Sequence, residues 1–209
     1  MKTRSIYFTM LFAGAAFVFF ASCSGNQKED SAAESHGARE NDVHSSETEA
    51  PQEASEPQFQ VEEKFREQLA GVFTSYLDLK DAFVASDADE TKEKAKETAS
   101  ALADVDMKLL SGAAHNDWMN YQAPLKTSLE EIRNSSDIES QRKAFSTVSD
   151  NLYKSIKAFG LGGKEAYYDY CPMAFNNEGA YWLSEQEKIR NPYFGDKMLT
   201  CGEVKEKLK

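Results

Sequence analysis

Four stretches between residues 59 and 163 carry apolar side chains at every third or fourth position, and this feature constrains the fold more than any other. They run from Val61 to Phe83, from Ala95 to Leu109, from Ala114 to Ile132 and from Ile138 to Phe159. Such spacing places the apolar side chains on one face of a helix, which other elements must cover. Short joins between successive helices favour antiparallel neighbours. We therefore expect an all-α fold, an antiparallel four-helix bundle over residues 59–163.

Polar residues and glycines separate the four stretches. Asp87 with Glu90, and Ser136 with Glu139, match the capping box that begins a helix. Pro124 stands inside the third stretch, where it removes a backbone hydrogen bond at a cost of about 3 kcal/mol. We expect the third helix to kink or to restart about one turn before this proline.

The helical pattern ends at Gly163, and residues 164–209 differ in character. This segment is rich in aromatic side chains and turn residues, and it contains Cys171 and Cys201. Residues 180–183 suit a short strand or a buried turn, and residues 202–209 suit a last helical turn. We expect an irregular C-terminal cap over residues 164–209, which packs on the bundle and forms one domain with it.

The N-terminal residues form a targeting signal. Lys2 and Arg4 precede an apolar run over residues 6–21, and small residues precede Cys23. This pattern indicates a secretory signal over residues 1–22; the alternatives are a plain signal peptide or a single membrane helix, for which the run is short. The small residues before the cysteine resemble a bacterial lipobox, which implies cleavage before Cys23 and acylation of that residue. We expect an outer membrane lipoprotein, anchored to the membrane through Cys23 and facing the periplasm or the cell surface.

Residues 23–58 are polar and acidic. Nine acidic residues face only Lys28 and Arg39 after the cysteine, and Val43 is the one large aliphatic residue. A segment of this composition buries too little apolar surface to offset its ordering entropy, so we expect a disordered tether. The formal net charge of the whole chain is −11, which argues against a nucleic-acid partner because phosphates are neutralised by Lys and Arg.

Sulfur donors gather in the predicted cap. A methionine stands two residues after its first cysteine, and another stands three residues before its second. Thiolate and thioether sulfur are soft donors, which select Cu(I). A histidine and a methionine four residues apart in the third helix would share one face and could add donors if the cap folds onto that helix. The predicted metal ligands are Cys171, Met173, Met198, Cys201, His115 and Met119.

The alternative use of these residues is a Cys171–Cys201 disulfide, since two cysteines in an oxidising envelope usually pair. Closing this loop would stabilise the fold by about 3–4 kcal/mol. A zinc site has weaker support, because there is no Cys-x-x-Cys pair and His115 is the one histidine of the predicted folded region. A thiol hydrolase using one cysteine and His115 is formally compatible with the residues. No catalytic constellation or phosphate-binding loop is present, so we expect no enzyme.

Four motifs in the cap resemble the signature of a bacterial domain of unknown function: Tyr170–Ala174, Gly179–Ser184, Ile189–Gly195 and Met198–Gly202. That domain occurs alone on lipoproteins and at the end of periplasmic adaptor proteins of heavy-metal (copper/silver) efflux pumps. The resemblance extends over about residues 65–205. It implies a helical domain with an envelope role near copper handling, and components of a heavy-metal efflux system as partners.

The start of the cap motif is also similar to a small heavy-metal-binding domain that begins Cys-Pro-Met-His-Pro. Here Ala174 and Phe175 replace the His-Pro pair, and a single Cys-Gly stands at the far end. The resulting hypothesis is an envelope lipoprotein that binds or buffers Cu(I) in heavy-metal homeostasis. The alternative is a disulfide-stapled helical interaction domain, without metal, that docks on an efflux pump or another envelope protein.

Overall fold

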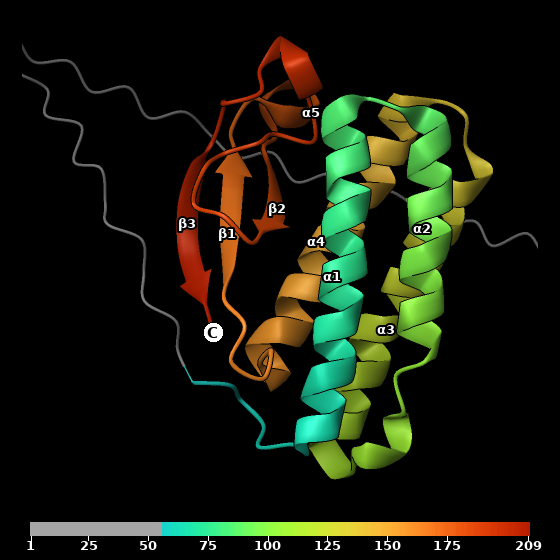
Figure 1. Cartoon of the computed structure of the whole chain (residues 1–209), viewed down its shortest axis with the longest axis vertical. Coiled ribbons are helices and arrows are strands. Elements are labelled where there is room, and N and C mark those ends of the chain that lie inside the picture. The colour runs from blue at the N-terminus through green and yellow to red at the C-terminus, as the bar shows by residue number, and fades with distance from the viewer. Residues whose placement is uncertain (1–55) are drawn as a thin grey trace, which may run out of the picture. The chain divides into compact units, whose positions relative to one another are not determined.

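The computed structural model describes residues 56–209 and shows a mostly helical fold with a small sheet at its C-terminal end (Figure 1). The predicted signal, the cysteine predicted to be lipidated and all but the last three residues of the predicted tether lie outside the described residues. The four long helices are α1 (Glu63–Ala85), α2 (Ala88–Ala103), α3 (Gly112–Asn134) and α4 (Ile138–Phe159). Within the described part of the chain, no helix is long and apolar enough to span a membrane.

The helix ends follow from local side-chain hydrogen bonds. The Asp87 carboxylate begins α2 by accepting from the backbone N–H groups of Asp89 (3.0 Å) and Glu90 (2.9 Å), so the predicted cap at this position is confirmed. The predicted cap at Ser136 is wrong, because α4 is capped one residue later. There the Asp137 carboxylate accepts from the N–H of Ser140 at 2.9 Å.

The second and third helices depart from their expected bounds. The predicted stripe extends to Leu109, but α2 ends at Ala103 and a short 3-10 turn, η1 (Met107–Leu109), follows. The Asp106 carboxylate accepts from the N–H of Lys108 at 3.0 Å, and this local bond competes with continued helix. The third helix α3 continues through Pro124 as one element, so no restart occurs there.

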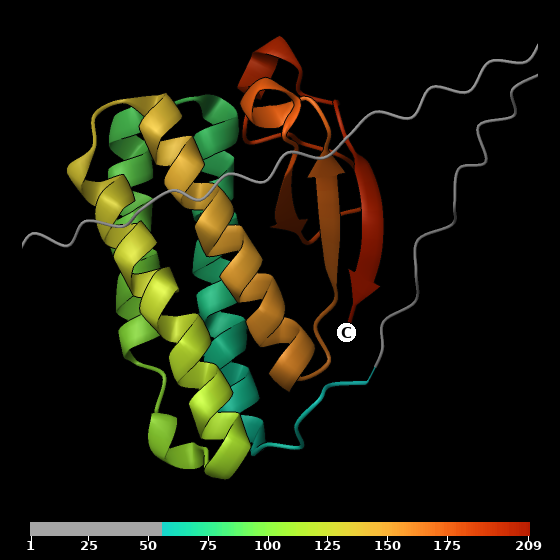
Figure 2. The ribbon, with the colours of Figure 1, turned by 180° about the vertical axis from the view of Figure 1, so that it is seen from behind.

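The long helices lie side by side, and each runs opposite to the one before it (Figures 1 and 2). Helix α1 packs on α2, α2 on α3 and α3 on α4, whereas α1 and α4 meet less extensively. The stripe residues form the interior as predicted. The largest side chains that are fully enclosed there are Phe65, Phe73, Tyr76, Phe83, Trp118, Phe145 and Phe159.

The C-terminal segment is a three-stranded antiparallel sheet, so the fold is mostly helical rather than all-α, and the expectation of an irregular cap is wrong. Its strands are β1 (Ala166–Cys171), β2 (Ala180–Ser184) and β3 (Glu203–Leu208), in the order β2-β1-β3. A short turn, α5 (Ala174–Asn177), joins β1 to β2, and η2 (Gly195–Lys197) precedes β3. The residues predicted as a last helical turn therefore form a strand. Their Glu and Lys side chains favour helix intrinsically, but pairing with the tyrosine-rich β1 decides the conformation.

The sheet packs on the helices mainly through β2 and α4. The hydroxyl of Tyr76 on α1 accepts the backbone N–H of Leu183 on β2 at 3.0 Å and hydrogen-bonds Ser149 on α4 at 2.7 Å. Arg142 on α4 is buried and donates to the carbonyl of Pro192 (3.0 Å) and to the hydroxyl of Ser86 (2.9 Å). These bonds fix the segment between β2 and β3 against the end of α1.

Candidate functional site

The sheet brings Cys171 and Cys201 together. Cys171 is the last residue of β1, and Cys201 stands two residues before β3, which pairs with β1. Their sulfur atoms lie 3.3 Å apart, and both thiols are free. Cys171 is fully buried, whereas Cys201 is partly exposed. A ligand can therefore reach this pair from the side of Cys201.

The loop that carries Cys201 is held by backbone and amide hydrogen bonds. The side-chain amide of the buried Asn191 donates to the Cys201 carbonyl at 2.7 Å, and the Asn191 N–H donates to the Leu199 carbonyl at 2.8 Å. Gly202 has a φ of +140°, and a Cβ there would lie 2.8 Å from the Trp182 ring. Glycine is needed at this position, so the chain passes close to Trp182 directly after the cysteine.

The hydrogen bond between the two thiols raises the pKa of Cys201, and burial raises it further. At neutral pH the Cys201 side chain is therefore a neutral thiol. Catalytic cysteines have the opposite property, a pKa lowered by a neighbouring positive group. The local electrostatics thus give no support to a thiol hydrolase. Metal binding at this pair would have to displace a proton.

Met173 and Met198 line one hollow beside α5, with a volume of about 340 Å³. Met173 is 47% exposed, an uncommon position for a large apolar side chain. The other lining residues are Glu139, Ala174, Phe175, Asn176, Tyr193 and Phe194. Neither cysteine contributes to the wall of this hollow. The structure thus brings the two methionines together and the two cysteines together as separate pairs.

The turn after Cys171 and Pro172 has an unusual backbone. Phe175, Asn176 and Asn177 follow one another in the left-handed region, with φ values of 51°, 59° and 71°. Non-glycine residues rarely adopt this conformation, and a run of three is costly. Such strain is typical of functional sites, where the surrounding structure enforces it. Two of these three residues, Phe175 and Asn176, lie in the wall of the hollow that the methionines line.

The structure does not bring His115 and Met119 to the cysteines. Both lie in the first turns of α3, which begins at the end of the helices opposite to the end where β1 finishes (Figures 1 and 2). The helix has 23 residues and is about 35 Å long. The spacing of His115 and Met119 correctly implied a shared helix face, but the cap covers the other end of the helices. The expectation that they join the cysteine site is corrected accordingly.

Asp169, in the centre of β1, is a buried carboxylic acid that the sequence reasoning missed. Its side chain is fully enclosed and has no well-formed hydrogen bond within the described residues, although the Trp182 side chain lies near enough to act as a weak donor. Burial raises its pKa to about 7, and the nearby Lys80 and Trp182 offset this only partly. The signal in the sequence was an aspartate inside a run of tyrosines, Ala166–Cys171, that reads as a strand with one buried face.

Comparison with known proteins adds one finding to this geometry. Residues 72–164 match the family model described as a protein of unknown function (DUF3347). The match begins within α1 and ends after α4, so it covers helices and not the sheet or either cysteine. It carries no association with lipoproteins or efflux adaptors, and it is narrower than the expected resemblance over about residues 65–205. No curated protein and no solved structure matches the chain.

Proposed function

We propose that this protein is a non-enzymatic lipoprotein of the bacterial envelope that binds or buffers Cu(I) in heavy-metal homeostasis. The observation that carries the proposal is the 3.3 Å separation of the Cys171 and Cys201 sulfur atoms. In this proposal the four long helices form an antiparallel four-helix bundle that supports the sheet and its cysteine pair. Partners would be components of a heavy-metal efflux system, and the protein would lie on the outer membrane.

The donor chemistry favours Cu(I) over harder ions. Two thiolates, with thioethers close by in sequence, are soft ligands. A structural zinc site takes four ligands from Cys, His, Asp and Glu. Among residues 56–209, no group of three or more such side chains is placed to hold a metal ion. A metal ion bound at the cysteine pair would therefore be held mainly by sulfur ligands.

We expect the reduced mature protein to take up about one Cu(I) per chain in competition with a coloured Cu(I) chelator. Cys171→Ser and Cys201→Ser should each abolish tight binding, because each removes a strong donor. Met173→Leu and Met198→Leu should weaken binding much less, because both thioethers line a separate hollow to which neither cysteine contributes, and the change keeps the side-chain volume. Unchanged affinity in both serine variants would refute the proposed site.

His115→Ala and Met119→Leu serve as matched controls, since these residues lie at the other end of the helices. Uptake by both should equal that of the unchanged protein. Because the pKa of Cys201 is raised, its proton must leave when the metal binds. Affinity should therefore fall as the pH is lowered from about 8 to 6, and a pH-independent affinity would exclude thiolate ligands.

A second candidate function is a disulfide-stapled interaction domain that binds an efflux pump or another envelope protein without metal. The full burial of Cys171 favours it, because an enclosed sulfur is a poor site for an ion that must enter and leave. The two sulfur atoms are also close enough to form a bond of about 2.05 Å after a small movement. The envelope is oxidising enough to maintain that bond.

The disulfide predicts a different result for the same protein. Oxidised protein should have no free thiol in the described region and should bind no Cu(I). Reduction, or either serine variant, should lower the free energy of unfolding by about 3–4 kcal/mol in the chain-entropy account, measured by chemical denaturation. Thiol titration of protein purified with and without reductant, with metal content determined in parallel, distinguishes the two candidates. Bound metal with two free thiols would exclude the disulfide.

The membrane anchor is a separate part of the proposal and rests on the residues before Cys23. Cys23→Ser should block cleavage by the lipoprotein signal peptidase and prevent acylation. Incorporation of labelled palmitate measures this directly. If the variant still incorporated the label, Cys23 would not be the lipidated residue.

A further inference from the structure

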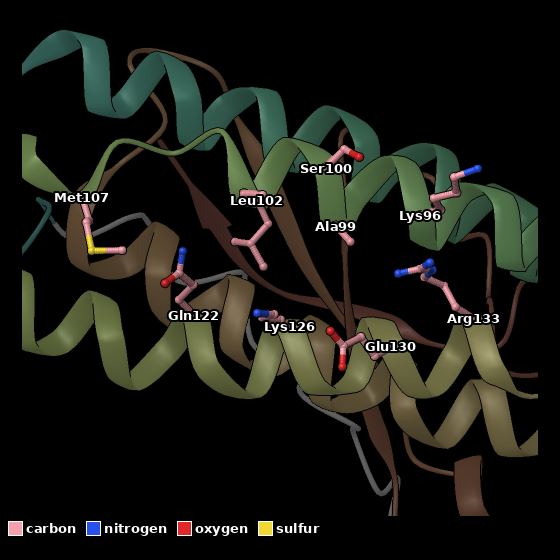
Figure 3. A pocket seen from close by; sticks show the side chains of 10 residues that line it. Lys96, Ala99, Ser100, Leu102, Met107, Gln122, Lys126, Glu130 and Arg133 are labelled. Atoms are coloured by element: carbon pink, nitrogen blue, oxygen red, sulfur yellow. The ribbon is translucent and has the colours of Figure 1, made fainter.

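An open groove lies between α2 and α3 (Figure 3), whereas the sheet packs mainly on α4. Its volume of about 570 Å³ is within the range of small-molecule pockets, about 300–1,000 Å³. Its walls combine long polar and small apolar side chains. The lining residues that matter here are Lys96, Ala99, Leu102, Met107, Lys126 and Arg133.

The charge of the groove opposes the charge of the protein. Three basic residues, Lys96, Lys126 and Arg133, line the groove with one acidic residue, Glu130, whereas the whole chain carries a net charge of −11. Lys126 and Arg133 make no ion pair or hydrogen bond within the described residues. Lys96 meets only the exposed Glu93, at 3.8 Å. The groove thus offers cations that an anion can bind without breaking an existing strong pair.

Apolar groups occupy the floor and one end of the groove. Leu102 points into it beside Ala99, and Met107 lies at the end far from Lys96 and Arg133 (Figure 3). Met107 is 37% exposed, one of three large apolar side chains with that much exposure among residues 56–209. Met107 thus adds exposed apolar surface at the end of the groove opposite its basic end.

The distance between the two ends of the groove matches the length of an extended acyl chain of medium length. Gln122, near Met107, and Arg133 are eleven residues apart on α3, which is about 16 Å. A ligand that fits has a negative head at Lys96 and Arg133 and a flexible apolar body on Ala99 and Leu102. We propose that this groove binds a small anionic amphiphile, a monomeric carboxylate with a medium-length acyl chain.

The test is binding of dodecanoate, below its micelle concentration, to the mature protein. Calorimetry should detect binding, and NMR of labelled methionine methyl groups should show a shift at Met107. Met119 is a built-in control, because its exposure of 39% is nearly the same and it lies outside the groove. Dodecanol, which lacks the charge, and butanoate, which lacks the chain, should each bind at least about tenfold more weakly.

Charge variants locate the head group without disturbing the interior. The double variant Lys96→Gln and Arg133→Gln should lower the affinity for dodecanoate about tenfold or more, since both side chains are exposed. Lys143→Gln, an exposed lysine on α4 outside the groove, should leave affinity unchanged. Equal binding of dodecanol, an unaffected double variant, or a shift at Met119 as large as that at Met107 would overturn the proposal.

Three other occupants would also overturn it. A synthetic peptide of the acidic residues 40–56 that shifts Met107, when dodecanoate does not, would assign the groove to the chain's own N-terminal segment. Anionic phospholipid vesicles that shift Met107 in place of dodecanoate would assign it to a membrane surface. A Met107 shift that depends on protein concentration alone would assign it to a second copy of the chain.

Discussion

Asp169→Asn should stabilise the folded protein at and above neutral pH by up to about 4 kcal/mol. The reason is the environment of the carboxyl group, which is fully buried and has no well-formed hydrogen bond within the described residues; only the Trp182 side chain, across the β1–β2 ladder, is near enough to donate weakly. Its pKa is raised from 3.8 to about 7 by burial. Each unit of such a shift corresponds to about 1.4 kcal/mol of lost stability once the group is ionised.

The pH dependence of the free energy of unfolding tests this explanation more specifically than the change in stability at one pH. Below about pH 4 the carboxyl is protonated in the folded and the unfolded chain, so its contribution to stability is fully present there. As the pH rises towards 7, the folded state retains a proton that the unfolded state has lost. Stability therefore falls across this window and levels off above the folded pKa of about 7. Denaturation series at several pH values should show this slope in the unchanged protein and a reduced slope in the asparagine variant.

Asp196→Asn is the matched control, because Asp196 is exposed in the same C-terminal segment. It should leave both the free energy of unfolding and its pH dependence unchanged. If the Asp169 and Asp196 variants had the same free energy of unfolding and the same pH dependence, the prediction would be wrong. The buried carboxyl would then not be ionised at neutral pH, or burial would not raise its pKa. The role of the nearby Lys80 can be tested with Lys80→Met, which should extend the fall in stability to higher pH, because the Lys80 charge lowers the pKa of Asp169.

Phe145→Ala should lower the free energy of unfolding by about 3–5 kcal/mol, the largest loss expected from a single truncation. Phe145 is fully buried on α4 and contacts three other rings. Its centroid lies 4.5 Å from that of Phe83, 5.2 Å from Tyr76 and 6.0 Å from Tyr193. The ring therefore joins α1, α4 and the segment before β3, and its removal leaves a cavity where helices and sheet meet.

Urea denaturation followed by far-ultraviolet circular dichroism measures this loss. Leu77→Ala, on the half-buried face of α1, should cost clearly less, since fewer contacts are lost there. Because Phe145 touches Tyr193, the near-ultraviolet signal of the sheet aromatics should also change. A loss below about 1 kcal/mol would show that this contact between helices and sheet contributes little to stability.

The helices were predictable because helical spacing is a long signal, repeated over many residues. The stripe from Phe65 to Phe83 alone fixes which face of α1 is buried. The early end of α2 was not predictable from the second apolar stretch, which runs from Ala95 to Leu109. Residues beyond the helix end, such as Val105 and Leu110, are buried although they are not helical. These residues continue the apolar pattern of the sequence, but the hydrogen bond of the Asp106 carboxylate to the Lys108 N–H gives the backbone a non-α-helical conformation here.

One strand of the sheet, β2, agrees with the short strand or buried turn expected at residues 180–183. The sheet as a whole escaped prediction because its strands are short and its partners are distant in sequence. Six-residue strands give too few alternations to stand out, and β3 consists largely of Glu and Lys. The sequence could suggest that Cys171 and Cys201 lie close together, because two cysteines in an oxidising envelope usually pair. Their actual proximity depends on the pairing of β1 with β3. Residue types alone could not show that α3 carries His115 and Met119 to the opposite end.

The composition of β3 has a consequence for self-association. This strand is at an edge of the sheet, and edge strands can template pairing with another strand. Four of its six residues are charged, and Glu206 and Lys207 make ion pairs with Lys157 and Glu165. Charge on an edge strand opposes strand-to-strand aggregation. The Glu and Lys that concealed the strand in the sequence thus keep neighbouring molecules from extending the sheet into fibrils.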